Sequence, residues 1–424
     1  MKRATGHIRT ELAVIGAGIA GFAASIFAIK RGIETMQIGH SGALAYTTGY
    51  LDLLGAGQGR LVEDPLSGLA ALRESEPEHP LARLGNDEIQ GAFQQFTAAL
   101  GNLGIKYSSP AGNNMMALLP AGLRKPTCSV PLTMLAGIEA AERKASTAIF
   151  DFTGLAGFSA AEFRANMASH WPRIAAHRLD FPGMEQGQLF PEVMARSLEV
   201  PAVLEELAGR MAPRLGGAEY VGLPAILGMH APDDVHQKLE HLLGLPVFEI
   251  PTIPPAVPGI RLRERFEHAL PEWGVKLEPQ LKVHRAIARK EGIRLFLSGP
   301  MDDLVVDAEA VILATGRFLS GGLKAGHERL SETLFDLPVH QPEGRSNWYR
   351  RACFDPRGHL INRAGLEVDG RMSPIGRNRT LVHDGVFAAG AVLAHQDWVR
   401  QRCGAGLAIA TAHRAVRSVA EYLG

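Results

Sequence analysis

Three glycines near the N-terminus have the spacing that brings a backbone close to a phosphate group. They are Gly16, Gly18 and Gly21, in the segment LAVIGAGIAGFAASIFAIKRG, residues 12–32. In a G-x-G-x-x-G turn the first glycine makes the tight turn, the second leaves room for a pyrophosphate, and the third lets a helix pack on a strand. The N-terminus of that helix offers free N–H groups to an anion. The segment therefore predicts a nucleotide-binding site.

The residues around this turn predict a buried strand followed by an apolar helix. The strand covers Leu12 to Ile15, and positions 12–29 carry no charge. A run of this length approaches that of a membrane-spanning helix, but its glycines and its β-type start favour a buried strand and helix. The start MKR before an apolar run is also typical of a secretory signal. We reject that interpretation because cleavage would destroy the glycine turn.

The composition excludes several classes of protein. Lys plus Arg and Asp plus Glu both number 44 in 424 residues, so there is no net charge to attract nucleic acid or an anionic membrane. Cys128, Cys353 and Cys403 are far apart and form no C-x-x-C, which excludes a local iron–sulfur, zinc or disulfide-exchange motif. We expect a cytoplasmic protein without a metal site, and the length predicts about two or three domains.

Two further strands in the C-terminal half end in glycine. One reads AVILATGR, residues 310–317, and the other reads GVFAAGAV, residues 385–392, before a small-residue helix over roughly 405–422. This layout resembles that of two-dinucleotide-binding-domain flavoproteins. In such proteins a strand ends in Ala-Thr-Gly, and a late strand ends in Ala-Gly before a helix that opens with glycine.

That resemblance implies roles for five residues. Thr315 and Gly316 would bring backbone close to the cofactor, and Gly390 would belong to the same site. Gly404 and Gly406 would begin a helix whose N-terminus faces the N1–C2 carbonyl edge of a flavin. A reduced flavin gathers negative charge at that edge, and a helix N-terminus would stabilise it.

The sequence between these motifs predicts an inserted domain. AIFDFTGL (148–155) and VFEIPTI (247–253) are strand-like, and the stretch 191–211 is helical in character. The Pro-rich stretch 251–261 should be a rigid loop that ends where a helix begins near Arg261, because proline lacks the N–H that strands and helix interiors use.

The predicted fold class is α/β, with a Rossmann-like flavin-binding domain interrupted by an α/β substrate or partner domain. The flavin-binding domain would be discontinuous, and its predicted segments are residues 1–80, 275–320 and 378–424. The predicted insert comprises residues 81–274 and 321–377. Both domains would contribute to one flavoprotein.

Several unusual strings together resemble the B subunit of anaerobic glycerol-3-phosphate dehydrogenase. They follow the family's order along nearly the whole chain: VIGAGIAGF (14–22), SGALAYTTGYLDLL (41–54), PTIPPAVPGIRL (251–262), ATGRFLSGGL (314–323), GVFAAGAVLA (385–394) and CGAG (403–406). The resemblance implies oxidation of glycerol 3-phosphate to dihydroxyacetone phosphate, with electrons passed towards quinone. It implies two partners: an FAD-containing A subunit, and an iron–sulfur C subunit that docks the assembly on the inner face of the membrane. It assigns FMN to the family's own chain.

One position bears on which flavin is bound. In an FAD-type fold the strand after the first helix, here about Thr35 to Ile38, usually ends in an acidic residue that binds the adenosine ribose. The alignment puts Gly39 at the acidic position. The fold favours FAD, whereas the missing carboxylate and the family resemblance favour FMN. We predict FMN, with FAD as the alternative.

Two further groups of residues are candidates for the site. Ser41, Thr48 and Gly49 follow the second strand, where such flavoproteins wrap a loop around pyrophosphate and ribityl hydroxyls, although these residues are also ordinary in loops. Arg261 and Arg317 lie in family-like motifs, and a phosphate-bearing substrate needs guanidinium groups. Structural or solvated arginines are the alternative at both positions.

No acidic residues form a recognisable acid/base pair, so the catalytic residues stay unassigned. Alcohol oxidation by hydride transfer to a flavin needs a base for the hydroxyl proton. His395, after the third glycine strand, is a candidate proton shuttle or a surface-loop histidine. Three functions stay open: a catalytic flavoprotein subunit, a non-catalytic electron-relay and assembly subunit, or a stand-alone fumarate-reductase-like dehydrogenase.

Overall fold

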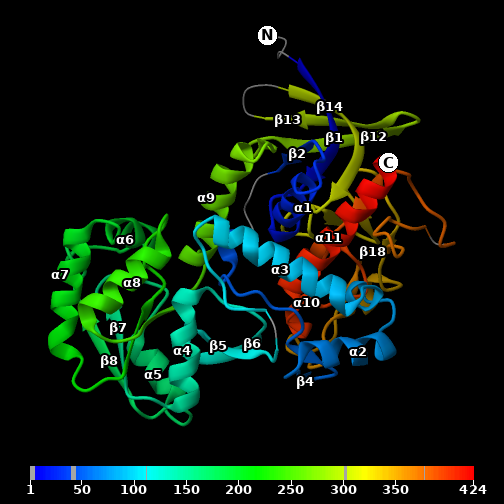
Figure 1. Ribbon diagram of the computed structural model, residues 1–424. Coiled ribbons are helices and arrows are strands. Elements are labelled where there is room, and N and C mark those ends of the chain that lie inside the picture. The colour runs from blue at the N-terminus through cyan, green and yellow to red at the C-terminus, as the bar shows by residue number, and fades with distance from the viewer. Residues whose placement is uncertain (1–4, 40–43, 111, 300–302, 377) are drawn as a thin grey trace. The chain divides into compact units, whose positions relative to one another are not determined.

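The computed structural model describes residues 5–39, 44–110, 112–299, 303–376 and 378–424 (Figure 1). The chain divides into two compact units. Unit 1 comprises Met1–Ala43, Asp52–Phe96 and Phe266–Gly424, and unit 2 comprises Leu44–Leu51 and Thr97–Arg265. Two of the boundaries fall inside helices, α3 (Asn86–Asn102) and α9 (Val257–Glu272).

A seven-stranded sheet forms the centre of unit 1, in the order β11–β2–β1–β14–β13–β12, with β19 also paired to β14. The parallel strands are β1 (Thr5–Ile15), β2 (Thr35–Ile38), β11 (Lys276–Glu278), β14 (Asp303–Leu313) and β19 (Val386–Ala388). An antiparallel extension is formed by β12 (Lys282–Arg289) and β13 (Gly292–Ser298). Ile15 is in register with both Ile38 and Leu313. The strands therefore end together at the edge where α/β sheets bind ligands.

Two helices with mostly buried side chains pack on each other in unit 1, α1 (Ile19–Ile29) and α11 (Gly404–Leu423). Figure 1 shows them side by side. Each begins at a glycine-containing turn after a parallel strand or its following loop. This arrangement brings both helix N-termini into the unit that carries the glycine motifs.

Shorter elements complete unit 1. They are β3 (Ala56–Gly57), β4 (Arg60–Leu61), α2 (Pro65–Ser75), β15 (Leu323–Ala325), β16 (Leu330–Glu332), β17 (Val339–His340), β18 (Gly365–Leu366) and α10 (Trp398–Gln401). The strands among them pair in antiparallel fashion: β3 with β4, β15 with β16, and β17 with β18.

Unit 2 contains a four-stranded parallel sheet in the order β10–β9–β7–β8. Its strands are β7 (Thr147–Phe152), β8 (Ile174–Leu179), β9 (Tyr220–Pro224) and β10 (Val247–Ile250). Its other elements are β5 (Met115–Leu119), β6 (Leu123–Thr127), α4 (Leu132–Arg143), α5 (Ala160–Met167), α6 (Pro191–Ser197), α7 (Pro201–Met211) and α8 (Pro232–Leu243). Three of the four strands are buried along their whole length, as expected when helices cover both faces of a parallel sheet.

The predicted α/β class is confirmed, whereas the two units divide the chain differently from the predicted domains. Residues 81–96 and 321–377, predicted in the insert, belong to unit 1. The Pro-rich stretch is helical from Val257 onward. Pro258 stands in the first turn of α9, where a missing N–H leaves no intrahelical bond unmade. The late strand spans only β19, and Gly390–Val392 forms a 3₁₀ turn.

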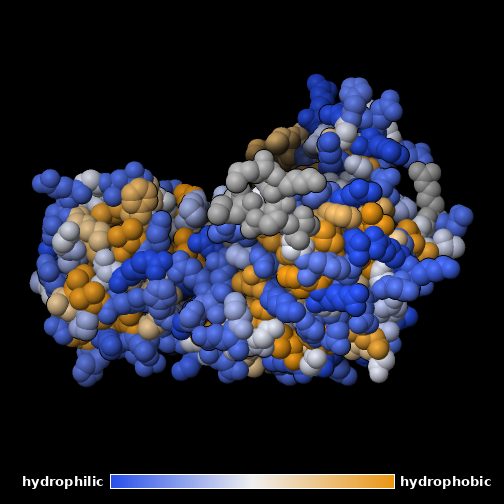
Figure 2. All heavy atoms as spheres, turned by 90° about the horizontal axis from the view of Figure 1, so that it is seen from above, coloured by the Kyte–Doolittle hydropathy of each residue, from blue (hydrophilic) through white to orange (hydrophobic). Residues whose placement is uncertain are grey.

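No helix formed by the described residues combines the length and apolar character needed to cross a membrane. On the face shown in Figure 2, hydrophobic residues are interspersed with hydrophilic ones. Scattered exposed apolar side chains of this kind are normal for a globular protein.

Candidate functional site

The glycine turn between β1 and α1 has the geometry that its spacing predicts. Gly16 has φ +137°, and a Cβ atom there would lie 2.2 Å from the carbonyl oxygen of Ala314. A Cβ atom at Gly21 would lie 2.0 Å from the carbonyl oxygen of Gly16. Neither position therefore accepts a side chain without backbone movement. A Cβ atom at Gly18, the N-cap of α1, would meet nothing within 4 Å, which leaves open space at the helix N-terminus.

A buried amide that sequence reasoning missed fixes this turn. Gln37, inside β2, donates from Nε2 to the carbonyl oxygen of Gly16 at 3.0 Å. Its Oε1 atom accepts from the hydroxyl of Ser25 in α1 at 2.8 Å. Gln37 thus links β2, the turn and α1. The signal was a fully buried polar residue within an apolar strand, since such residues need partners.

The residue after β2 has no side chain to offer a ribose. Gly39 has φ +140°, a conformation that favours glycine, and its N–H donates to Glu278 O at 3.2 Å. A Cβ atom at Gly39 would lie 3.4 Å from Cα of Gly16 and 3.6 Å from N of Ala17. The position that carries an acidic residue in FAD-type folds therefore borders the glycine turn and lacks a carboxylate.

The turn after β14 also approaches the cofactor side of the sheet. Ala314 N–H donates to the carbonyl oxygen of Ile15 at 2.9 Å, which joins this turn to the end of β1. Gly316 has φ +66°. The Thr315 hydroxyl oxygen is buried and has no hydrogen-bond partner among the described residues. A buried hydroxyl without a partner is costly, so a ligand oxygen or nitrogen beside Thr315 fits this part of the site.

Gly390 lies between the two helices of the site. Its φ is +77°, and its N–H donates at 2.9 Å to the hydroxyl of Thr411 in α11. A Cβ atom at Gly390 would lie 2.7 Å from Cβ of Ala20 in α1. Glycine here allows the end of β19 to fit between α1 and α11.

The start of α11 is closely covered by the segment that follows Leu51. Gly406 N–H donates to Asp52 O at 2.6 Å, and a Cβ atom at Gly406 would lie 2.7 Å from the carbonyl oxygen of Leu53. A Cβ atom at Gly404 would lie 3.1 Å from the Trp398 ring. Both glycines therefore permit close packing. One N–H group of the helix start, predicted to face the flavin, is used by a backbone carbonyl.

A family model described as an FAD binding domain matches residues 11–407. The chain belongs to this family of FAD-binding domains. It is 28% identical to the B subunit of anaerobic glycerol-3-phosphate dehydrogenase from Vibrio cholerae serotype O1, and the match covers 96% of each chain. It is 29% identical to the protein of the same name from Yersinia pestis, again over 96% of each chain. These matches confirm the resemblance found in the sequence.

Among solved structures, the chain is similar to 3-ketosteroid Δ1-dehydrogenase from Sterolibacterium denitrificans. The identity is 11% and the TM-score 0.45, and the match covers 97% of this chain and 99% of that chain. Membership of the FAD-binding family makes the protein a flavoprotein, in keeping with the nucleotide-binding interpretation of the glycine turn.

The loop predicted to follow the second strand falls partly outside the described residues. Ser41 is one of the residues that lie outside them. Thr48 and Gly49 belong to unit 2, where the Tyr107 hydroxyl donates to Gly49 O at 2.7 Å. Gly49 has φ +83°, and a Cβ atom there would lie 2.9 Å from Cβ of Pro258. Within unit 2 these contacts fix the loop beside the start of α9.

Arg317 holds loops of the flavoprotein together. Its Nε atom donates to Ala391 O at 2.9 Å, one Nη atom donates to Asn362 O, and the other donates to Gln396 O at 3.1 Å. Burial lowers the pKa of Arg317 to about 10, which leaves it protonated at neutral pH. A substrate phosphate would have to compete with three backbone carbonyls. The structure thus supports the structural alternative for Arg317 rather than the predicted substrate contact.

Arg261 forms a buried ion pair in unit 2. Its two Nη atoms each lie 2.7 Å from a carboxylate oxygen of Glu249. The same guanidinium donates to the backbone oxygens of Gly228 and Leu227 at 2.7 and 2.9 Å. Glu249 also accepts from the Thr133 hydroxyl at 2.7 Å. This network ties α9 to β10 and to the end of β9, so the structural alternative again accounts for the arginine.

Replacing Arg261 with methionine should lower the free energy of unfolding by about 3–5 kcal/mol, because Glu249 would be left as an unpaired buried charge. Urea denaturation monitored by circular dichroism measures this loss. Arg164→Met, at an exposed arginine in α5 of the same unit, is the matched control and should change stability little. Wild-type stability combined with a raised KM for a phosphate substrate would instead reveal a substrate contact.

The titratable groups near the start of α11 do not supply a free base. Buried His79 accepts from Leu81 N–H at Nδ1, so its proton is on Nε2, which lies 3.2 Å from Gln401 Oε1. Neither ring nitrogen therefore has a free lone pair. Burial also raises the pKa of the Cys403 thiol, which keeps it protonated. The catalytic residue stays unassigned among these groups.

Burial of His79 predicts a pH-dependent stability. Burial lowers the pKa of His79 from 6.5 to about 4, so the unfolded chain binds the extra proton in this range. The free energy of unfolding should therefore fall as the pH drops from 6.5 to 4, by up to about 3 kcal/mol from this group. His79→Asn should flatten that part of the profile, as measured by urea denaturation at several pH values. Parallel profiles for the two proteins would contradict the assignment.

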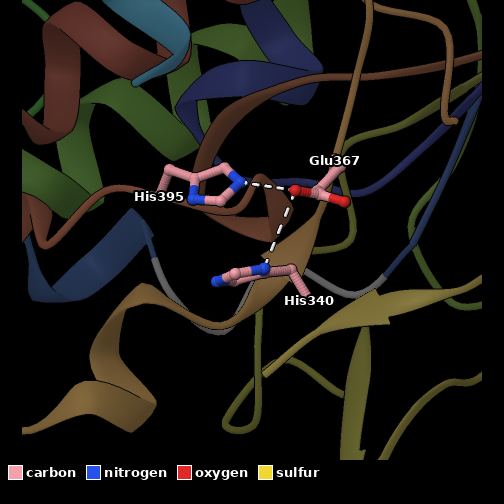
Figure 3. Close-up of side chains that lie close together, drawn as sticks. All are labelled: His340, Glu367 and His395. Atoms are coloured by element: carbon pink, nitrogen blue, oxygen red, sulfur yellow. Dashed lines mark hydrogen bonds and ion pairs between the residues drawn. The ribbon is translucent and has the colours of Figure 1, made fainter. Parts of the chain in front are cut away.

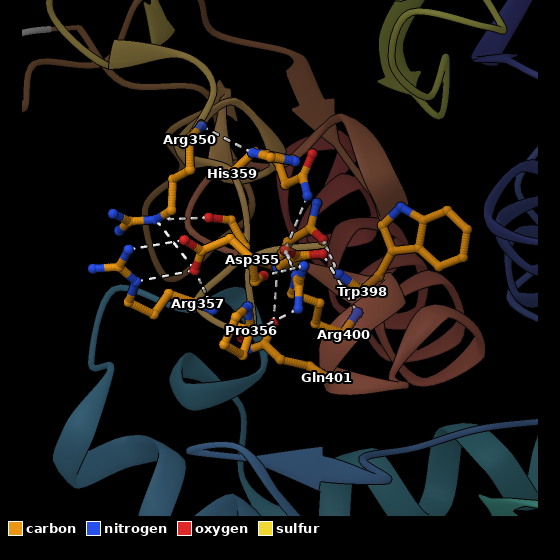
Figure 4. Close-up of polar contacts among 12 residues, drawn as sticks. Arg350, Asp355, Pro356, Arg357, His359, Trp398, Arg400 and Gln401 are labelled. Carbon is orange, nitrogen blue, oxygen red and sulfur yellow. Dashed lines mark hydrogen bonds and ion pairs between the residues drawn. The ribbon is translucent and has the colours of Figure 1, made fainter. Parts of the chain in front are cut away.

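A polar network holds α10, the short helix before α11 (Figure 4). Asp397 caps α10 and accepts from the Asn362 amide at 3.2 Å. Arg400 donates to the backbone oxygens of Asp355 and Pro356 at 2.6 and 3.2 Å. The network fixes the loop that begins α11. It thereby positions Trp398 against the glycine that opens that helix.

Proposed function

We propose that this chain is the flavoprotein B subunit of an anaerobic glycerol-3-phosphate dehydrogenase complex. The complex oxidises sn-glycerol 3-phosphate to dihydroxyacetone phosphate and passes electrons to quinone. The observation that carries the proposal is the glycine cradle around Gly18 in a chain matched over 96% of its length by relatives of that name. Its partners would be an FAD-containing A subunit and an iron–sulfur C subunit. The latter would place this cytoplasmic chain at the inner face of the membrane.

The residues of unit 1 fit a flavin phosphate and ring system. The open space at Gly18 would receive a phosphate at the N-terminus of α1, where the helix dipole favours negative charge. The unpartnered hydroxyl of Thr315 would hydrogen-bond the cofactor. A bound flavin would supply the acceptor for the electrons removed from the substrate. Gln37 would keep the turn in its binding conformation.

The flavin we propose is FMN, with FAD as the alternative. Gly39 supports FMN because no carboxylate follows β2 to bind an adenosine ribose. The family name supports FAD. Denaturing the purified protein and separating the released chromophore by chromatography identifies the flavin. FMN in the extract is expected, FAD would select the alternative, and a colourless protein that neither flavin reconstitutes would overturn the cofactor proposal.

A relay role within the complex is the second candidate. It is favoured by the side chains near the start of α11, since both nitrogens of His79 are engaged and the Cys403 thiol is protonated. Arg317, the cation predicted for the substrate, is committed to backbone carbonyls. In this role the bound flavin passes electrons between partners, and another subunit holds the substrate.

Reconstitution of the complex tests the proposed function. Co-expression with the A and C subunits should give an assembly that reduces a quinone analogue with glycerol 3-phosphate. An assembly that contains the Gly18→Leu chain should lose this activity by at least about tenfold, because its flavin is missing. Undiminished quinone reduction by an assembly that lacks this chain would contradict both the catalytic and the relay proposals.

A further inference from the structure

Three separate segments of unit 1 lie side by side through backbone hydrogen bonds. In the pair of β17 and β18, His340 is opposite Gly365. Leu366, the next residue of β18, also bridges in parallel to Leu393 and accepts from Ala394 N–H at 2.9 Å. The backbone therefore joins residues 339–340, 365–367 and 393–395 into one short array.

The array brings together two imidazoles and one carboxylate (Figure 3). Oε1 of Glu367 lies 2.7 Å from Nε2 of His395 and 3.7 Å from Nδ1 of His340. The two imidazole centroids are 4.1 Å apart. All three potential ligand atoms lie within 4.8 Å of one another. The three side chains point towards one another from three different segments.

The backbone at His395 is held in an uncommon conformation that supports this convergence. Its φ is +64°, in the left-handed region that side chains other than Asn, Asp and Gly seldom adopt. The N–H of His395 donates to Arg363 O at 2.9 Å, which stabilises the conformation. The left-handed turn directs the His395 ring to Glu367. Residues held in sparsely populated backbone regions of this kind cluster at ligand sites.

The donors and spacing suit a zinc-class cation. Imidazole nitrogen and carboxylate oxygen bind Zn²⁺ at about 2.0–2.2 Å, so two ligand atoms of a tetrahedral site lie roughly 3.4 Å apart. The two measured separations, 2.7 and 3.7 Å, lie on either side of that value. The side chains of His340 and Glu367 are 40% and 36% exposed, so an ion in water can reach them. Two nitrogen donors disfavour Mg²⁺ and Ca²⁺, which prefer oxygen ligands.

We propose that His340, Glu367 and His395 bind one divalent cation of the zinc class, with a fourth position left to water. The ion would clamp the loop after Gly390 to the β17–β18 pair. That loop supplies the carbonyls of Ala391 and Gln396 that hold Arg317. The site does not depend on the flavin proposal, because its ligands are distinct from the glycine cradle.

Zinc titration of the purified full-length chain tests the site. Isothermal titration with ZnCl₂, after removal of metal with a chelator, should show one ion bound per chain. Glu367→Gln and His395→Asn should each weaken binding by at least about 100-fold, since each removes one of three ligands. Asparagine is chosen at 395 because it tolerates the left-handed backbone. His327→Ala, at an exposed histidine of the same unit, is the matched control and should bind like wild type.

Two further measurements make the result decisive. X-ray absorption at the zinc edge of the loaded wild-type protein should show two imidazole ligands, which tests the site without any variant. Thermal unfolding and flavin content of each variant separate loss of a ligand from loss of the fold or of the cofactor. No zinc binding by folded wild-type protein, or undiminished binding by both ligand variants, would overturn the proposal.

Discussion

Flavin binding should be lost when Gly18 is replaced by leucine, while unit 1 stays folded. A Cβ atom at this position meets nothing within 4 Å, and φ is −93°, so the new side chain fits the protein without strain. It would extend into the space at the N-terminus of α1 where a flavin phosphate would bind. Affinity should fall by at least about 100-fold, which corresponds to about 2.8 kcal/mol. Titration of the flavin-free protein, followed by flavin fluorescence, measures this loss.

The chain offers two matched glycine controls for this experiment. Gly91→Leu lies in α3, within the same unit, and a Cβ atom there also meets nothing within 4 Å, so both folding and binding should persist. Gly21→Leu places a side chain 2.0 Å from a backbone carbonyl and should destabilise the fold itself. If Gly18→Leu retained flavin with an affinity near that of wild type, the phosphate would have to lie elsewhere.

The fold class and the glycine cradle were predictable because their signals are local. Strand, turn and helix follow one another within residues 12–29, and the tight contacts of Gly16 and Gly21 agree with the roles that the spacing assigns. The α/β class follows from the same alternation of strands and helices elsewhere. In each case the deciding residues are neighbours in the sequence, so the pattern contains the physical cause.

The roles of the two arginines could not be predicted because a guanidinium is placed by its tertiary partners. Arg261 finds Glu249, and Arg317 finds backbone carbonyls up to 79 residues away in the sequence. A family motif marks such an arginine as constrained but does not say whether a ligand or the protein constrains it. Gln37 shows the opposite case, since a polar residue in an apolar strand indicates a partner without naming it.

The boundary of the insert could not be predicted for a similar reason. Residues 321–377 contain only short strands and turns, whose local composition does not indicate which sheet they accompany. Their assignment to unit 1 depends on distant contacts such as those of β18 with the loop after β19. The histidines and the glutamate of the proposed cation site also converge only through this packing.

The isolated chain should have its flavin reduced slowly, if at all, by glycerol 3-phosphate. The physical reason is that the described residues near the start of α11 provide no free base for the substrate hydroxyl. His79 uses both ring nitrogens, and burial keeps the Cys403 thiol protonated. Anaerobic stopped-flow measurement of flavin bleaching gives the rate. Addition of the A subunit should accelerate bleaching by at least about tenfold, because the partner would then supply the base.

Two controls decide how such a result is interpreted. Reduction of the same sample by dithionite shows that the flavin is bound and able to accept electrons. Substitution of His395 by asparagine tests the remaining candidate base, whose Nε2 atom is paired with Glu367 at 2.7 Å. Rapid and saturable bleaching of the lone chain would show that it has its own substrate site, and the relay role would then be wrong. If that bleaching were lost in His395→Asn while dithionite still reduced the flavin, His395 would be the base that the sequence alone could not assign.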